Sequence, residues 1–146
     1  MTRETFRPGT AYRASHRITT RWMDNDAYGH VNNVIYYSWF DSAVNAFLIG
    51  SGMLDIENGA IIGLVVESGC RYGRAVGFPQ PVTAMLRVGH LGTSSVRYEI
   101  GLFTDDHMEA AAEGHFIHVY VDRATRRPAP LPQTWRDALE AIRAPA

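Results

Sequence analysis

The sequence predicts an α+β fold in which one long central helix is wrapped by an antiparallel five-stranded sheet. Three observations lead to this prediction: a strand-like segment near the start, a long apolar segment with helical periodicity, and four strand-like segments after it. The chain of 146 residues fits one domain over residues 1–146 with a substantial core. Only turn-forming residues separate the segments, so we expect no second domain.

The first elements follow directly from local composition. Residues 1–14 mix Arg, Pro, Gly and Thr without periodicity, and we expect them to form a loose N-terminal arm. Residues 15–22 place Thr and Ile at β-favouring positions and predict the first strand. The helix is expected to begin at Asn32 or Asn33, either a suitable N-cap, and to end before Gly50 and Gly52. Its apolar face contains Tyr36, Phe40, Val44, Phe47 and Leu48.

Four later segments have the composition of strands: residues 60–73, 81–91, 94–104 and 112–122. The third alternates most clearly, with one apolar face made of Val96, Tyr98, Ile100 and Leu102. Residues 134–143 follow a proline-rich stretch and predict a short closing helix. A single sheet around one helix leaves unpaired strand edges, which natural proteins usually cover by pairing. We therefore expect at least a homodimer.

Composition excludes several classes of protein. The net charge of −1 gives no electrostatic reason to expect nucleic-acid binding. No apolar stretch approaches the roughly 20 residues needed to span a membrane, and Cys70 is the single cysteine, so we expect a cytoplasmic protein without membrane association. His115 and His118 are three residues apart on a predicted strand and should point to opposite faces, so no metal site is predicted. No phosphate-binding or nucleophile-elbow motif is present.

Residues 21–37 (RWMDNDAYGHVNNVIYY) gather polar groups at the start of the predicted helix. A helix N-terminus presents unpaired N–H groups and a partial positive charge, which can bind a developing anion. Asp26 could act beside it as a base or nucleophile, with the amides near Asn33 as the oxyanion site. This arrangement suits hydrolysis of an ester or thioester. The alternative for Asp26 is a purely structural role, accepting backbone hydrogen bonds in a turn.

The same residues resemble the hotdog-fold acyl-CoA thioesterases, in the branch that includes 4-hydroxybenzoyl-CoA thioesterase. The motif consists of Asp24, Asp26, Gly29, His30, Val31, Asn32, Asn33, Tyr36, Tyr37, Phe40 and Asp41, and the resemblance extends over residues 15–143. It implies that Asp26 is the nucleophile or general base and that the Asn33 N–H polarises the thioester carbonyl. It also implies that coenzyme A is part of the substrate, without a separate cofactor. Homodimers or homotetramers with active sites between subunits are the implied assembly.

Other residues of the motif keep two interpretations. His30 either orients the carbonyl or supports the loop, and Asp24 is expected to organise the loop or to pair with Arg21. Gly29, Val31, Tyr37 and Ser68 are predicted to contact substrate. Asn33, Tyr37, Asp41 and Asn45 form an i, i+4 polar stripe that lines the acyl pocket or faces solvent or another subunit, with Asp41 as the reserve base.

The predicted function is hydrolysis of acyl-CoA to a free acid and CoA. A second hypothesis is a non-catalytic protein that binds acyl-CoA. A third is the enoyl-CoA hydratase branch, in which four residues separate the Asp from the His; here only three lie between Asp26 and His30. The identity of the acyl group and the choice between CoA and acyl carrier protein stay open.

Overall fold

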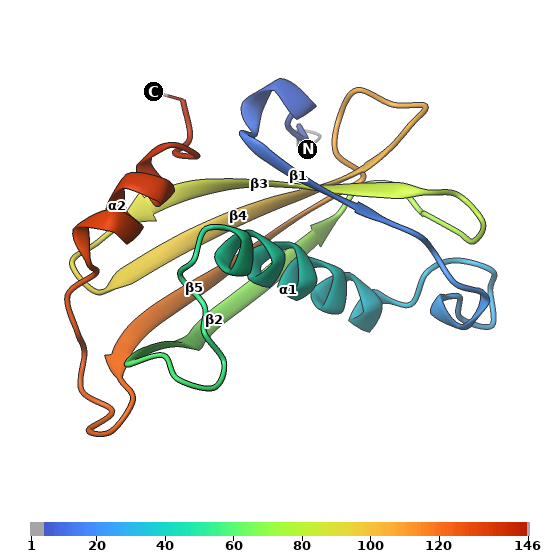
Figure 1. The fold of residues 1–146 in the computed structure, drawn as a ribbon. Helices are drawn as coiled ribbons and strands as arrows, with labels where there is room; N and C mark the ends of the chain where they lie inside the picture. Colours follow the sequence, from blue (N-terminus) through green and yellow to red (C-terminus); the bar gives the residue numbers. More distant parts are fainter. Residues whose placement is uncertain (1–4, 146) are drawn as a thin grey trace.

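The computed structural model describes residues 5–145 and has the predicted architecture, a five-stranded antiparallel sheet with one long helix on its concave face (Figure 1). The strand order in the sheet is β1-β3-β4-β5-β2. The strands are β1 (Ala14–Ile18), β2 (Ile61–Tyr72), β3 (Val82–Leu91), β4 (Ser95–Thr104) and β5 (Ala112–Asp122). The helices are α1 (Asn33–Gly50) and α2 (Gln133–Glu140), with short 3₁₀ turns η1 (Gly9–Ala11) and η2 (Trp22–Asp24).

Helix α1 begins and ends where its capping residues allow. Asn32 is the N-cap, and its side-chain oxygen accepts a hydrogen bond from the Val34 N–H. Beyond the last turn, Gly52 adopts a positive φ of 72°, a conformation that glycine tolerates without strain. The buried side of α1 consists of Tyr36, Trp39, Phe40, Ala43, Val44 and Leu48. The predicted helix is thus confirmed, although Phe47 is only partly buried.

The concave face of the sheet supplies the surface that covers α1. Val96, Tyr98, Ile100 and Leu102 of β4 are fully buried, which confirms the predicted alternation. On β5, Gly114 leaves room for Phe40, because a Cβ at this position would overlap the Phe40 ring. Helix α2 packs Leu139 into the same core.

The first strand is shorter than the sequence predicts. The first strand ends at Ile18, because residues 22–24 turn into η2 through reciprocal hydrogen bonds between Arg21 and Asp24. Residues 5–14 of the expected loose arm contact the sheet. Arg7 forms an ion pair with Glu113, and Tyr12, which packs on Phe103, is 4% exposed. Residues 1–4 of the predicted arm lie outside the described residues.

Strands β1 and β2 form the two edges of the sheet. The β2 edge carries adjacent apolar side chains that stay accessible: Leu64, Val65 and Val66 are 38%, 51% and 60% exposed. None of the helices within residues 5–145 is long and apolar enough to cross a membrane.

Candidate functional site

The loop before α1 is organised by a buried carboxylate. Asp24 is 0% exposed. Its Oδ2 accepts the Arg21 backbone N–H at 2.7 Å, and its Oδ1 accepts the Arg21 Nε and Nη2 at 3.1 and 2.9 Å. The Asp24 carbonyl in turn accepts the Asn32 N–H at 2.9 Å. The predicted pairing of Asp24 with Arg21 is therefore confirmed, and it connects η2 to the first residue of the helix cap.

Asp26 lies in a tight turn that follows the hydrogen-bonded pair of Arg21 and Asp24. Its N–H donates to the His30 carbonyl at 2.7 Å, and its carbonyl accepts the Gly29 N–H at 3.2 Å. Gly29 has a φ of 79°, so the turn requires the backbone freedom of glycine. The Asp26 Oδ1 accepts the Tyr28 and His30 N–H groups at 2.8 and 3.3 Å. Among the described residues Oδ2 has no hydrogen-bond partner, so one oxygen of this exposed carboxylate is fixed and the other is free.

The tip of α1 leaves one backbone donor unpaired. Asn32 accepts two hydrogen bonds from the first turn of the helix. Its side-chain oxygen accepts the Val34 N–H, and its carbonyl accepts the Ile35 N–H. Within residues 5–145 the Asn33 N–H has no hydrogen-bond partner, as expected for the first residue of a helix. A donor in this position can stabilise negative charge on an incoming oxygen.

A pocket of about 260 Å³ opens at this helix tip. Its two sides come from distant parts of the chain and consist of His30, Val31, Asn33 and Tyr36 on one side and Tyr72, Gly73, Arg74 and Ala75 on the other. The Tyr72 hydroxyl donates to the Asn33 carbonyl at 3.2 Å, and the Val31 N–H donates to the Val76 carbonyl at 2.7 Å. These two bonds hold the chain leaving β2 against the start of α1. We call residues 73–75 the wall segment.

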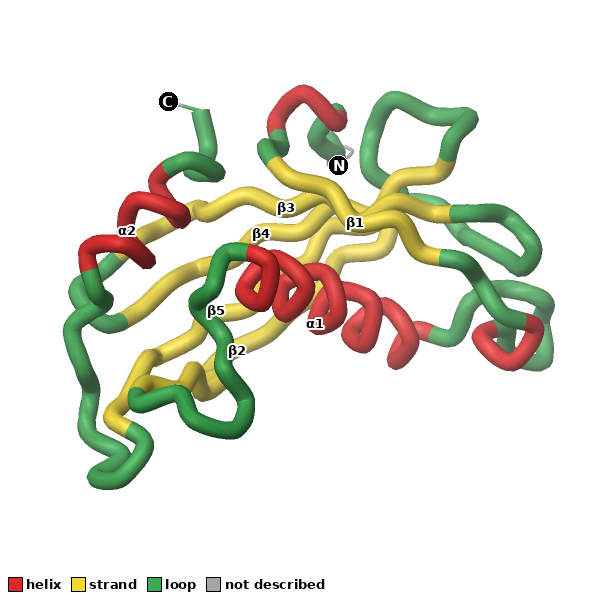
Figure 2. Tube along the Cα trace, viewed as in Figure 1, coloured by secondary structure: helices red, strands yellow, loops and turns green. Residues whose placement is uncertain are grey.

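The two loops at this end of the molecule also contact each other. Figure 2 shows the loop around η2 beside the loop that joins β2 to β3. The Phe78 N–H donates to the Asn25 Oδ1 at 3.1 Å, and the Trp22 and Phe78 rings pack edge to face with centroids 6.0 Å apart. Trp22 and Tyr28 remain 75% and 86% exposed, so two accessible aromatic rings lie close to Asp26 in the chain.

The structure brings together only some of the residues predicted for the site. His30, Val31 and Asn33 line the pocket, whereas Asp26, Gly29, Tyr37 and Ser68 do not. Asp26 is joined to a pocket residue by a hydrogen bond, since its Oδ1 accepts the backbone N–H of His30, and Ser68 is exposed on β2. The sequence prediction missed the Tyr72 hydroxyl and the wall segment, because no motif distinguishes them before the strand order is known.

The phenol and thiol groups near the pocket remain protonated at neutral pH. Burial raises the pKa of Tyr72 and of Tyr36, and it raises the pKa of the Cys70 thiol to about 11. Tyr72 is therefore a hydrogen-bond donor in this site. Cys70 lacks the thiolate character of a catalytic cysteine.

A second polar group is buried on β5. His118 is 5% exposed, and within the described part of the chain neither of its ring nitrogens has a hydrogen-bond partner. It packs against Tyr98 and Tyr120, whose hydroxyls are 2.7 Å apart. Burial lowers the pKa of His118, and the charge of Asp41 partly opposes this shift.

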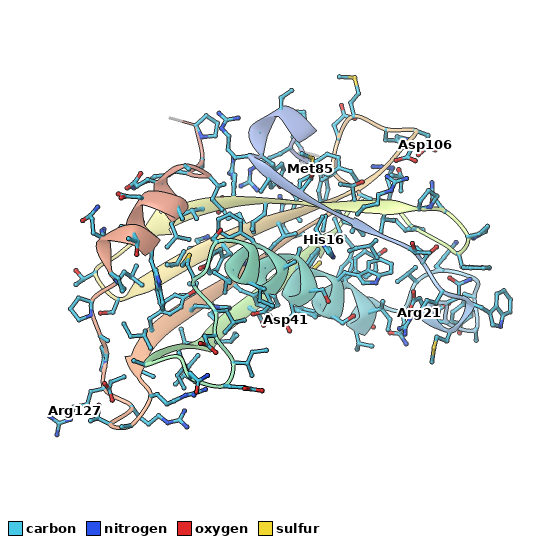
Figure 3. All side chains as sticks on the ribbon, in the orientation of Figure 1. His16, Arg21, Asp41, Met85, Asp106 and Arg127 are labelled. Carbon is cyan, nitrogen blue, oxygen red and sulfur yellow. The ribbon has the colours of Figure 1, made fainter. Side chains whose placement is uncertain are left out.

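His115 and His118 do point to opposite faces, since His115 bonds to Glu67 on the outer face at 2.7 Å. Asp41 is exposed on α1 (Figure 3), and its Oδ1 accepts a hydrogen bond from Asn45 Nδ2 at 3.1 Å. The residues described include no cluster of three or more His, Cys, Asp or Glu side chains that could hold a metal ion.

Comparison with known proteins adds the family. The model of the thioesterase-like superfamily matches residues 20–139. The PA5185 protein of Pseudomonas aeruginosa strain PAO1 is 52% identical, with a TM-score of 0.90 over 95% of this chain and 97% of the other. The PA2801 protein of Pseudomonas aeruginosa, named as a candidate thioesterase, is 35% identical, with a TM-score of 0.80 over 87% of this chain and 98% of the other.

A more distant structure shows the same fold. Slr0204, a 1,4-dihydroxy-2-naphthoyl-CoA thioesterase from Synechocystis, is 17% identical, with a TM-score of 0.76 over 86% of this chain and 93% of the other. No protein with a curated function matches the chain. The match to the family model covers most of the sequence, and the fold is that of hotdog thioesterases. The chain belongs to the thioesterase-like superfamily.

Proposed function

We propose that the protein hydrolyses acyl-CoA thioesters to a free acid and CoA, with Asp26 as nucleophile or general base. The observation that carries the proposal is the unpaired Asn33 N–H at the pocket, next to a turn that fixes one oxygen of Asp26 and leaves the other free. A thioester carbonyl seated in the pocket would direct its oxygen to this N–H. The developing oxyanion would then lie at the positive end of the α1 dipole.

The geometry supports two forms of the reaction. In the first, the free oxygen of Asp26 attacks the carbonyl carbon, the C–S bond breaks, and the thiolate of CoA leaves; water then hydrolyses the mixed anhydride. In the second, Asp26 takes a proton from water, and the resulting hydroxide attacks the same carbon. A thiolate is a good leaving group, so neither form requires a strong general acid. His30 lines the pocket and contributes its side chain to substrate orientation.

The family supports the reaction class, and the name of the Synechocystis protein supports a CoA ester as the substrate. For this chain we propose a small-molecule acyl-CoA, no separate cofactor, and a cytoplasmic setting. The last point is consistent with Cys70 being a free thiol. The side chain of Tyr37 and the exposed Ser68 are proposed to meet the substrate only in an assembled site.

The test is release of thiol from a panel of acyl-CoAs by the purified protein and by Asp26→Asn. Removal of the base or nucleophile should lower kcat by at least about 100-fold. Asp137→Asn is the matched control, because Asp137 is an exposed carboxylate on α2 that bonds only to Gln133 among the described residues. Asp41→Asn tests the reserve base and should keep most of the activity.

Three outcomes would contradict the proposal, one for the role of Asp26 and two for the function. Asp26→Asn with most of the wild-type kcat would refute the assignment of Asp26. Tight binding of CoA esters without thiol release by the wild-type protein would establish a binding protein. Hydration of crotonyl-CoA without thiol release would establish a hydratase.

We also propose that the protein forms a homodimer through the β2 edge, with a homotetramer as the larger alternative. The support is the row of exposed apolar side chains on an unpaired edge strand, Leu64, Val65 and Val66. A second copy related by two-fold symmetry would pair the edges and cover these residues. Sedimentation of Val65→Asp beside the wild type tests this, and an unchanged mass for the variant would refute the β2 interface.

A further inference from the structure

The N-terminal segment is fastened across the outer face of the sheet. Arg7 Nη1 lies 2.5 Å from the Glu113 Oε2, and Pro8 forms a β-bridge with Glu109. Farther along, the buried Tyr12 ring packs edge to face on Phe103, with centroids 5.7 Å apart. These contacts fix the position of the segment against the ends of β4 and β5.

One residue of this N-terminal segment, Phe6, packs against Gly73, the first residue of the wall segment. A Cβ on Gly73 would lie 2.7 and 2.9 Å from the Cε2 and Cζ atoms of Phe6. The Phe6 ring therefore occupies the space that a side chain at position 73 would fill. The Arg71 guanidinium lies 4.9 Å from the centroid of the same ring, and Arg71 also pairs with Glu113 at 3.0 Å.

Hydrogen bonds also hold the wall segment at this end: Arg74 donates from Nη1 to the Glu109 carbonyl at 3.2 Å and from Nη2 to the Thr104 Oγ1 at 3.1 Å. The N–H groups of Gly73 and Arg74 both donate to the Ala111 carbonyl, at 2.8 and 2.9 Å. This shared acceptor turns the chain sharply out of β2 and toward the tip of α1. Because Gly73 has no side chain, it contributes no packing of its own, and the Phe6 ring supplies the apolar contact at this point.

We propose that Phe6 is a positioning residue for the pocket at the tip of α1, acting through the wall segment. Its ring packs against Gly73, and Gly73 and the next residue, Arg74, line the pocket that also contains Asn33. Removing the ring leaves a void behind a glycine, and the wall can then relax into it. A displaced wall widens the pocket without changing Asp26 or Asn33. The role in catalysis rests on the proposed thioesterase activity.

The experiment uses the full chain and the Phe6→Ala variant. We expect KM for an acyl-CoA to rise about five- to tenfold with kcat changed by less than about twofold, because the wall contributes uniform binding. Amide hydrogen exchange at Gly73 and Arg74 should accelerate in the same variant, since their shared hydrogen bonds lose support. Phe6→Leu keeps an apolar side chain at this position, so its KM and its amide exchange at Gly73 and Arg74 should stay close to those of the wild type.

Met85→Ala is the matched control. Met85 lies beneath η1 (Figure 3) and belongs to the same outer apolar cluster as Phe6, with its sulfur 3.3 Å from the Cβ position of Gly9. It should lower stability without changing KM or the exchange of Gly73. A double variant, Phe6→Ala with Gly73→Ala, places a methyl group in the vacated space and should lie closer to the wild type than Phe6→Ala alone.

The proposal is overturned if Phe6→Ala leaves both KM and the exchange rates unchanged, or if Met85→Ala changes them equally. If the wild-type protein releases no thiol, the proposed function fails. In that case, the rates of amide hydrogen exchange at Gly73 and Arg74 in Phe6→Ala still test whether Phe6 positions the wall segment.

Discussion

Two carboxylates, two residues apart in the motif loop, should have opposite effects when they are neutralised. Asp24 is buried and accepts two charge-assisted hydrogen bonds from the Arg21 side chain, at 3.1 and 2.9 Å. Asp24→Asn keeps the volume and an acceptor for the Arg21 backbone N–H but places an amide donor against the guanidinium. Hydrogen bonds to charged groups contribute about 1.5 kcal/mol each at the lower end, so the loss is about 3 kcal/mol. Arg21 is 60% exposed and can turn to water, which limits the loss to about 2–3 kcal/mol.

Asp26→Asn should behave in the reverse way. Its carboxylate is exposed, and the amide oxygen of Asn can still accept the Tyr28 and His30 N–H groups, so the loss of unfolding free energy should stay below about 1 kcal/mol. Urea denaturation of both variants measures stability, and thiol release below the transition measures activity. We expect Asp24→Asn to be less stable and partly active, and Asp26→Asn to be stable and inactive. Equal stability losses in the two variants would refute the division of roles.

Two further predictions concern the core. Gly114→Ala should cost about 1–3 kcal/mol, because its Cβ overlaps the Phe40 ring, whereas Gly50→Ala, with no atom within 4 Å of its Cβ position, should be neutral or slightly stabilising in the same denaturation assay. His118 has a lowered pKa in the folded protein, since burial outweighs the attraction of Asp41 and the facing groups of Tyr98 and Tyr120 are neutral. At pH values above the unfolded pKa of about 6.5, His118 is neutral in both states and does not change the free energy of unfolding. Below that pH the unfolded chain binds the proton more readily than the folded protein, so stability falls. Stability measured from pH 7.5 to 5 should fall less steeply for His118→Phe than for the wild type, and equal slopes would refute the assignment.

The helices and strands could be predicted from the sequence because the spacing of their apolar residues indicates which side of each element is buried. The alternation from Val96 to Leu102 matches a strand with one face under α1, and the spacing from Tyr36 to Leu48 matches the buried side of that helix. The role of Asp24 was also predictable. Arg21 is three residues away, the spacing of a reciprocal cap.

The wall segment and the N-terminal segment could not be predicted in the same way. Gly73 and Phe6 meet across 67 positions of the chain, and neither has a local pattern that indicates the contact. From the sequence, Arg7 belongs to the expected loose arm, and only the folded sheet places Glu113 opposite it. Contacts of this kind depend on strand order, and a single sequence contains no direct record of strand order.

The exposure of the Asp26 turn and the exposure of the β2 edge have a common explanation in the proposed dimer. A carboxylate in open water is a weak base and a well-solvated nucleophile, so the attack proposed here needs a site from which most water is excluded. In one protomer, the pocket is bounded on one side by Tyr72, at the end of the edge strand β2. A second copy paired along that edge would continue the sheet beyond β2. Its surface would then lie beside the pocket and shield the pocket from water. The apolar edge and the incomplete enclosure of the pocket therefore point to the same missing surface, and a monomeric variant should be folded but a poor catalyst.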